Sequence, residues 1–374
     1  MSITTHMLTG ATGFVGSAIL LELLLRTNDP IVAIVRASSG QTPERRLHDT
    51  LEAVAQGFGL DEAWRSQLGR LRVVAGDITA PGCGVEETLP AARWVVWHAA
   101  ASLQYQDRHR EQIERTNIEG TRNTLALASA LGAELFHHVS TAYVAGRRIG
   151  LVTPVPGDLT LVNNHYERSK VIGEQLVMAS GQRYRIFRPG IVIGHSRTKY
   201  ALNYNGMYGF LRGLIKFRDV LDRTQPGLST RTVVQMRCDE VGELGLVTVD
   251  EVAREVVLLA QRDAPVGIYH ITNPTAPNVA ETIHTLFDLA RLPRPTFVND
   301  EAGYSTLDRK LSERLEFYRS YLVNPKQFCR ASVQAVLGED SSPGLALPPD
   351  QILQFSRGYA AQVEAERVDV PVSR

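Results

Sequence analysis

The sequence predicts an α/β fold in which a doubly wound parallel sheet is joined to a smaller, mainly helical C-terminal region. Over the first 140 residues, short runs rich in β-branched and aromatic residues alternate with longer segments of helical periodicity. This alternation is typical of a parallel sheet covered by helices on both faces. The chain beyond residue 275 is mostly helical in pattern and has proline-rich joints, which indicates a second region.

The expected strands are short and apolar. They begin at Met7-Leu8 and continue at 31–35, 71–74, 94–97, 135–139, 184–188 and 268–272. Helices are expected over 14–26, 43–68 and 111–131, and another over 249–262 has Asp250 near its start as a candidate N-cap. Residues 196–240 break the pattern, with scattered tyrosine, glycine, arginine and leucine.

Composition excludes several classes of partner. The 374 residues suffice for about two domains, and 40 basic residues balance 40 acidic ones. Net charge therefore gives no case for nucleic acid or an anionic membrane surface. The three cysteines, Cys83, Cys238 and Cys329, lie far apart, so we expect no metal site and no disulfide framework. With neither a signal peptide nor an apolar run of membrane-spanning length, we expect a cytoplasmic location.

A glycine-rich turn follows the first expected strand. Residues 8–16 read LTGATGFVG and place Gly10, Gly13 and Gly16 between a strand and a helix. Gly10 would permit the tight turn, Gly13 the close approach of a pyrophosphate, and Gly16 the packing of helix on strand. The anion would lie at the positive end of the helix. We therefore expect a Rossmann-type dinucleotide site, with these candidates in the turn: Gly10, Thr12, Gly13, Phe14, Val15 and Gly16.

This turn divides the chain by role. We assign residues 1–195, with 241–275 returning to them, to the dinucleotide-binding domain. Residues 196–240 and 276–374 are assigned to the substrate-binding region, where aromatic side chains would suit an acyl chain or a fused-ring substrate. The alternative for this region is a purely structural subdomain.

The residue after the second strand predicts which dinucleotide binds. NAD-preferring folds place a carboxylate about 20 residues beyond the turn, where it accepts from the ribose 2′-hydroxyl. Here Arg36 stands at that place, no carboxylate lies between it and Pro43, and Arg46 follows in the next helix. A guanidinium suits a 2′-phosphate. We expect NADP(H), with NAD(H) less favoured; the alternative is that Arg36 merely caps the sheet edge.

Two further strand ends fit the same cofactor. Asp77 and Ile78 follow the third strand, where the carboxylate can accept from an adenine amino group, although an aspartate there also commonly caps a loop. The small residues Ala99, Ala100 and Ala101 follow the fourth strand and would let the backbone pass beneath the nicotinamide ribose.

Tyr166 and Lys170 form the candidate catalytic pair. Four residues apart on a helix, they lie on one face, where an ammonium would lower the phenol pKa from its reference of about 10. Such spacing also arises by chance as a surface pair. The fifth strand, however, ends in Ser140 and Thr141, and a hydroxyl there can hold a substrate carbonyl against Tyr166. Strand alternation brings one of the two into the site without choosing between them.

Together these motifs resemble extended short-chain dehydrogenases/reductases. The strings TGATGFVG, GDI, HAAA, NIEGT, VSTAYVAG, YERSK and RPGIVIG follow in the superfamily's order from residue 7 to about 275. IVAIVRA, STAYV and SKVIGEQLV make the chain most similar to the thioester reductase and fatty acyl-CoA reductase branch, which is male-sterility-like and NAD-binding.

The resemblance implies roles for single residues. It makes Thr141 the catalytic hydroxyl rather than Ser140 and gives Lys170 the nicotinamide ribose. It also adds Asn117, Pro189 and Ile191 to the residues near the cofactor. Residues beyond about 275 match no motif, and no carrier or adenylation segment precedes the turn. We therefore expect a substrate that is free in solution or delivered by a carrier protein.

Three functions compete at this point. The favoured one is NADPH-dependent reduction of an acyl thioester to aldehyde or alcohol. The second is an NAD(P)-dependent ketone reductase or hydroxy-dehydrogenase acting on a secondary metabolite or a sterol-like ring. The third is a catalytically silent dinucleotide sensor, which would not need Thr141, Tyr166 and Lys170 intact. A sugar-nucleotide epimerase is disfavoured because Arg36 points to diffusible NADPH.

Overall fold

The computed structural model of the chain describes residues 4–38, 40–104 and 106–368. Its main sheet is parallel and seven-stranded, in the order β11-β7-β5-β4-β1-β2-β3. These strands are β1 (Thr4–Thr9), β2 (Ile31–Val35), β3 (Leu71–Ala75), β4 (Arg93–His98), β5 (Leu135–Val139), β7 (Tyr184–Pro189) and β11 (Gly267–Ile271). The predicted α/β class with a doubly wound sheet is confirmed. The strand order reverses between β1 and β4, which is where open sheets of this kind bind ligands.

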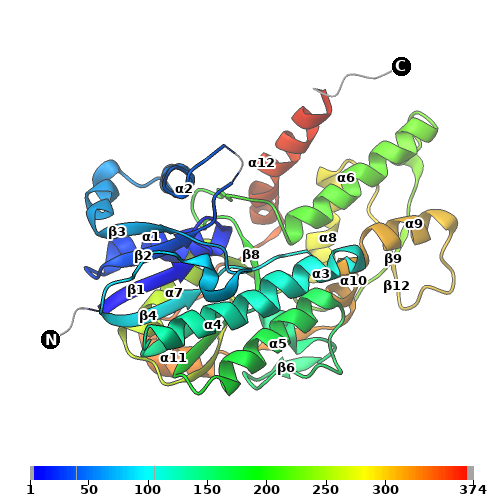
Figure 1. The fold of residues 1–374 in the computed structure, drawn as a ribbon. Helices are drawn as coiled ribbons and strands as arrows, with labels where there is room; N and C mark the ends of the chain where they lie inside the picture. The colour runs from blue at the N-terminus through cyan, green and yellow to red at the C-terminus, as the bar shows by residue number, and fades with distance from the viewer. Residues whose placement is uncertain (1–3, 39, 105, 369–374) are drawn as a thin grey trace.

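Both faces of the sheet are buried, which explains why its strands are continuous apolar runs. In β1, Met7 packs into the core beneath α4 (Gly120–Ala130) and α5 (His165–Ala179), whereas Leu8 packs into the opposite core. That second core includes α1 (Phe14–Arg26), α2 (Pro43–Gly57), α7 (Val249–Gln261) and α11 (Ala331–Leu337). Figure 1 shows α4 and α5 lying in front of the strands in this view.

Two expected helices are divided differently. The single helix expected over 43–68 is wrong, because α2 ends at Gly57 and a separate 3-10 helix, η1 (Glu62–Arg70), begins after Asp61. Each piece has its own cap, since the side chains of Thr42 and Asp61 each accept a backbone N–H of the following turn. The segment expected over 111–131 runs as α3 (Arg110–Ile113), a π-helical stretch η4 (Glu114–Glu119) and α4.

The segment 196–240 is more regular than its sequence suggests. It contains α6 (Met207–Thr224), whose apolar residues recur at helical spacing, and then η6 (Ser229–Arg231) and β9 (Gln235–Arg237). The expected cap of the helix at 249 is also wrong. Thr248 precedes α7, and Asp250 instead accepts hydrogen bonds from the backbone N and Oγ of Ser196, at 2.8 and 2.6 Å.

A third core, separate from the two on the faces of the sheet, lies beside the sheet. It joins α6 to α8 (Val279–Leu289), α9 (Thr306–Arg314), α10 (Glu316–Val323) and α12 (Pro349–Val368). It meets the sheet domain through Tyr143, Ile193 and Leu246, which follow the strands or lie next to them. In Figure 1, α6 and α12 project from the upper side of the molecule. The α11 helix belongs to the late chain yet packs in the sheet core, so the proposed boundaries at 196, 240 and 276 stay a prediction.

Three two-stranded parallel ladders connect the parts. They pair β8 (Ile191–Ile193) with β10 (Leu246–Thr248), β9 with β12 (Thr296–Val298), and β6 (Gly150–Val152) with β13 (Lys326–Phe328). Short 3-10 turns complete the described elements: η2 (Pro81–Gly84), η3 (Asp107–His109), η5 (Ala142–Ala145) and η7 (Gly338–Asp340). Within the described ranges, none of the helices combines the length and apolar character needed to cross a membrane.

The contact between α1 and the glycine turn makes a testable prediction. A Cβ added at Gly16 would lie 2.1 Å from the carbonyl oxygen of Gly10, so Gly16→Ala must displace the helix from the turn. We expect it to lower the free energy of unfolding by about 1–3 kcal/mol in chemical denaturation. Gly358→Ala is the matched control because it is also inside a helix and meets nothing within 4 Å. It should be neutral or stabilising, and equal losses in both variants would contradict this account.

Candidate active site

The glycine turn lies at the carboxyl end of β1 and rests on the backbone that follows β4. Gly10 has φ +80, and a Cβ there would come within 2.5 Å of the Ala100 nitrogen, so this position requires glycine. Gly13 caps α1 without a side-chain hydrogen bond. The first backbone N–H groups of the helix, from Phe14 onward, therefore have no side-chain acceptor from the cap. The turn is thus shaped to receive an anion.

Arg36 contacts both Arg46 and Asp77, the other residues expected near the adenosine part of the cofactor. Arg36 is 65% exposed, and its Nη1 lies 3.6 Å from Oδ2 of Asp77. Arg46 donates from Nη1 to the Arg36 carbonyl at 2.7 Å and so steadies the loop. Asp77 also accepts from the Thr79 backbone N at 2.9 Å. Burial raises the pKa of Asp77, but the hydrogen bonds from Thr79 and the nearby Arg36 outweigh it and bring the pKa below its ordinary value.

The remaining cofactor candidates border the same edge of the sheet. Ala99 continues β4 by donating to the Thr9 carbonyl at 3.2 Å, and Ala100 and Ala101 are half-buried beside it. Asn117 lies in the π-helical stretch, where its side chain bonds the backbone of Ser102 and, at 2.9 Å, Oγ of Ser169. Three other candidates take part in packing or pairing there: Ile78 against Gly120, Pro189 opposite Ile271, and Ile191 beside Gly245.

Thr141 and Tyr166 are brought together. Thr141 is the buried residue that caps η5 directly after β5, and its Oγ1 accepts from the Tyr143 backbone N at 3.2 Å. Its side chain also shares a hydrogen bond with the hydroxyl of Tyr166 at the start of α5. Ser140 is buried too, but its Oγ has no partner among the described residues. Of the two hydroxyls considered, Thr141 is the one that meets Tyr166.

The electrostatic environment of Tyr166 differs from the expectation of a lowered pKa. Burial of the hydroxyl raises its pKa above the ordinary value, the adjacent Glu167 carboxylate raises it further, and the Thr141 hydrogen bond opposes both. The groups that shift this pKa do not include Lys170, whose Nζ donates to the Val139 carbonyl at 2.8 Å. Tyr166 is therefore held as a neutral phenol.

Lys170 is not part of a surface pair. It is 5% exposed, and burial lowers its pKa to about 8, although Glu174 partly opposes this shift. The bond to Val139 fixes the ammonium at the carboxyl end of β5, one turn of α5 beyond Tyr166. A donor in this position can be shared with a ligand that crosses the sheet edge.

Another buried pair fastens α5 to the sheet. Glu174 and Arg188 are 0% and 2% exposed and form two parallel bonds, at 2.9 and 2.6 Å. Arg188 lies in β7, so the pair joins the catalytic helix to a central strand. Sequence reasoning did not identify it, because helical periodicity gives no sign that a glutamate and an arginine 14 residues apart will be buried together.

Sequence reasoning also missed the polar cluster behind Tyr166. Glu167 is 0% exposed and accepts from the Asn163 backbone N at 2.7 Å and from Asn163 Nδ2 at 3.0 Å. It also accepts from the Tyr321 hydroxyl and lies within electrostatic range of Lys326. The available signal was the glutamate inside YERSK. Asn163 lies only four residues away, but Tyr321 and Lys326 lie more than 150 residues away, in a region that matched no motif.

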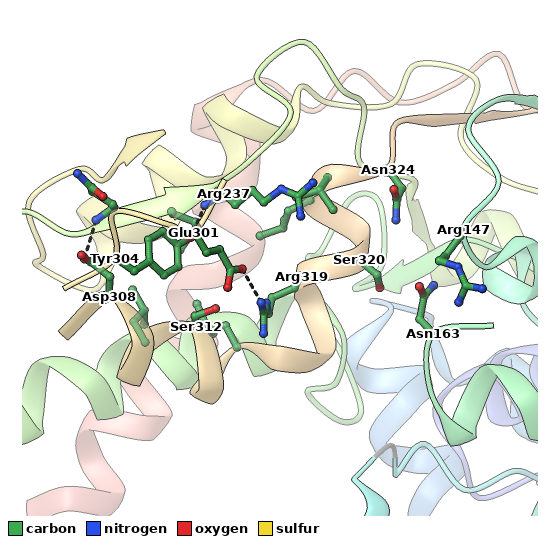
Figure 2. Close-up of a pocket in the computed structure, with 16 residues that line it drawn as sticks. Arg147, Asn163, Arg237, Glu301, Tyr304, Asp308, Ser312, Arg319, Ser320 and Asn324 are labelled. Atoms are coloured by element: carbon green, nitrogen blue, oxygen red, sulfur yellow. Dashed lines mark hydrogen bonds and ion pairs between the residues drawn. The ribbon is translucent and has the colours of Figure 1, made fainter. Parts of the chain in front are cut away.

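A cavity of about 290 Å³ lies between the sheet domain and the C-terminal helices. Figure 2 shows Arg147 and Asn163 on one side of it and Tyr304 and Arg319 on the other. From the segment 196–240 it takes residues 235–237, whereas the aromatic side chains of Tyr208 and Phe210 are buried in the core of α6. Asn163 lines the cavity and also donates hydrogen bonds to Glu167.

The fold and these strand ends define a dinucleotide-binding protein of the extended short-chain dehydrogenase/reductase class. A model of the NAD-binding family described as male sterility protein matches residues 8–256. The chain belongs to this family, which confirms the resemblance seen in its motifs.

Relatives and solved structures agree with this assignment. The chain is 26% identical over 305 residues to a component of the linear gramicidin synthase of Brevibacillus parabrevis, covering 76% of this chain and 6% of that protein. It is 31% identical over 222 residues to fatty acyl-CoA reductase 1 of Gallus gallus, covering 50% of this chain and 42% of that protein. The chain thus corresponds to under half the length of either relative. The terminal R domain of the myxalamid PKS-NRPS pathway shares the fold, with TM-score 0.72, 24% identity and coverage of 96% and 92%.

The residues present fit a bound dinucleotide. The turn has no room for a Cβ at Gly10, α1 begins without a side-chain cap, and Ser140 Oγ lacks a partner among the described residues at the adjoining strand end. The three groups lie at the carboxyl edge of the sheet, where such a ligand binds. The described part of the chain contains no cluster of histidine, cysteine, aspartate or glutamate able to hold a metal ion.

The Glu174–Arg188 pair predicts a large stability effect. Glu174→Gln leaves the Arg188 guanidinium buried without a carboxylate, and we expect a loss of about 3–5 kcal/mol in the free energy of unfolding. The control is Glu114→Gln, which removes an exposed partner of Arg110 and should cost less than about 1 kcal/mol. Urea denaturation followed by circular dichroism measures both. Similar losses in the two variants would show that the buried pair does not anchor α5.

Proposed function

We propose that the chain is an NADPH-dependent reductase that transfers hydride to the carbonyl carbon of an acyl thioester. The observation that carries this proposal is the hydrogen bond between Thr141 and Tyr166 at the carboxyl edge of the sheet, with Lys170 one helical turn away. The likeness to a fatty acyl-CoA reductase supports a thioester as the substrate class.

The chain's own groups act on the carbonyl oxygen. A reduced nicotinamide bound across the sheet edge supplies the hydride. Thr141 and Tyr166 hydrogen-bond the oxygen and orient the carbonyl. As negative charge develops on that oxygen, Tyr166, which is protonated at neutral pH, donates its proton. Collapse of the resulting hemithioacetal expels the thiol and leaves an aldehyde; its reduction to the alcohol would require a second NADPH in place of the oxidised cofactor and reprotonation of Tyr166.

Lys170 and the sheet edge hold the cofactor in this proposal. The glycine turn, with Thr12 and Val15, would bind the pyrophosphate. Asn117 fixes the segment at Ser102, beneath the expected path of the nicotinamide ribose. Arg36 is exposed beside Asp77 and is free to turn toward a 2′-phosphate, which supports NADPH over NADH.

The cavity between the two regions supports an extended acyl substrate. Its volume of about 290 Å³ approaches that of a typical small-ligand site. We propose that it receives a distal part of the acyl thioester, presented free or by a carrier protein, while the thioester carbonyl lies at Tyr166. Arg147 and Arg237 line this cavity together with Arg319, which pairs with Glu301 of the same lining, so both signs of charge are available to polar groups on that substrate.

Tyr166→Phe tests the proposed chemistry. We expect kcat for NADPH-dependent reduction of acyl thioesters to fall by about 10²–10⁴-fold, because the proton donor is lost, while NADPH binding stays measurable. Tyr184→Phe, at the start of β7 on the opposite edge of the sheet, is the matched control and should retain activity. The assay follows loss of the reduced cofactor's absorbance with a panel of acyl-CoA thioesters and ketones. Retained turnover in Tyr166→Phe would refute the catalytic assignment, and turnover of ketones alone would refute the thioester.

Arg36→Ala tests the choice of cofactor. Loss of a guanidinium that pairs with a 2′-phosphate should raise the Kd of NADPH by about 10–100-fold and leave that of NADH unchanged. Arg45→Ala removes an arginine of similar exposure from the first turn of α2 and should change neither the Kd of NADPH nor that of NADH. Quenching of protein fluorescence by the two cofactors provides the measurement. An equal effect on both cofactors would remove the basis for preferring NADPH.

A further inference from the structure

Glu167 is a buried carboxylate that the proposed chemistry does not use. It follows Tyr166 directly, is 0% exposed and is held by the backbone and side chain of Asn163, at 2.7 and 3.0 Å. Asn163 lies just before α5, so these bonds close the start of the helix onto its own carboxylate. A carboxylate with no exposure is costly unless it is fully hydrogen-bonded and paired with a positive charge.

The other partners of Glu167 come from the C-terminal region. Tyr321 of α10 donates its hydroxyl to the carboxylate and itself bonds the Asn164 side chain. Lys326 of β13 supplies the positive charge, is 6% exposed and is held by the Asn324 carbonyl at 3.1 Å. Lys326 also pairs with Gly150 of β6, which lies between Thr141 and Tyr166 in the sequence.

We propose that Glu167 is a positioning residue for Tyr166, which it holds by tying the start of α5 to α10 and β13 through Asn163, Tyr321 and Lys326. The inference rests on the proposed function because it assumes that Tyr166 is the proton donor. It adds that the C-terminal region helps to set the position and the charge state of that donor.

The charged and titratable groups around Glu167 explain how it affects the charge state of Tyr166. Tyr143 from η5, Tyr321 from α10, Lys326 from β13 and Tyr166 from α5 itself surround the carboxylate. Burial raises the pKa of Glu167, and the Asn163 bonds, the Tyr321 hydroxyl and Lys326 oppose that rise. The net effect raises the pKa of Glu167; wherever its carboxylate is ionised, it disfavours a second negative charge on the neighbouring phenol. Tyr166 consequently keeps its proton until one is required by the substrate oxygen.

A purely structural role predicts different behaviour. If Glu167 only joined two parts of the fold, its replacement would change stability and leave the ionisation of Tyr166 as it was. The ionisation of Tyr166 is therefore the measurement that separates the two roles. It needs neither substrate nor turnover, so it remains informative even if the chain reduces no thioester.

Glu167→Gln removes the charge and keeps an oxygen that can accept from Asn163. The ultraviolet difference spectrum between a protein and its Tyr166→Phe form reports the phenolate at this one position. We expect the Tyr166 midpoint to move down by at least about one pH unit in Glu167→Gln. Glu316→Gln removes a carboxylate from an exposed site on α10 and should leave the midpoint unchanged. The same midpoint in Glu167→Gln and the wild type, or an equal shift in Glu316→Gln, overturns the proposal.

The pH profile of reduction gives the second measurement. Reduction needs protonated Tyr166, so kcat falls as pH rises through the pKa of this residue, and the falling limb should begin at lower pH in Glu167→Gln. If that variant does not fold, Tyr321→Phe removes the hydroxyl that bonds Glu167 and the Asn164 side chain, and it removes no charge. We expect its kcat to fall several-fold, with an unchanged KM for NADPH. An unchanged kcat overturns the proposal, whereas a wild type that turns over no thioester refutes the proposed function alone.

Discussion

The position of α5 is the constraint on which the site depends. This helix buries three ionisable side chains, Glu167, Lys170 and Glu174, each at most 5% exposed. A buried charge without a partner costs several kcal/mol, so the helix is stable only where all three are compensated at once. Their partners lie in different parts of the molecule: the C-terminal region, the carbonyl of Val139 at the end of β5, and Arg188 in β7. Few placements satisfy all three, and the observed one brings Tyr166 to Thr141.

This arrangement makes the site a product of both regions. The glycine turn and the strand ends belong to the sheet domain, although Phe14 of the turn packs against the core formed with the C-terminal helices. Tyr166, in contrast, is flanked by Glu167, which accepts a hydrogen bond from Tyr321 of α10 and lies within electrostatic range of Lys326 in β13. The β6–β13 ladder adds a backbone connection at the loop between Thr141 and Tyr166. The C-terminal region therefore supports the position of Tyr166, the residue that we propose as the proton donor.

Local sequence patterns predicted the parts of the fold that local physics determines. The strands were recognisable because both faces of the sheet are buried, and the glycine turn because only glycine fits at Gly10 and Gly16. The patterns failed where a side chain's environment is set by distant residues. The break after Gly57 and the helix α6 lay within segments whose composition is mixed, although α6 carries a helical apolar stripe that a stricter periodicity count detects. The burial of Glu167 and Glu174 had no local signal, because it depends on groups outside their own helix: Tyr321 and Lys326 for Glu167, and Arg188 in β7 for Glu174.

The pKa of Tyr166 shows how far such remote groups matter. From spacing alone, Lys170 should lower it and favour the phenolate, which is the form needed to take a proton from an alcohol. In the folded chain the ammonium is bound to Val139, while burial and Glu167 raise the pKa. A phenol in this environment is suited to donating a proton, which is what an oxygen receiving negative charge requires. The exposed guanidinium of Arg36 is the feature on which the proposed preference for NADPH rests. Proton donation by Tyr166 and hydride supply by NADPH are the two halves of one reduction, and we infer that these two sites, one at each end of the expected cofactor path, serve it together.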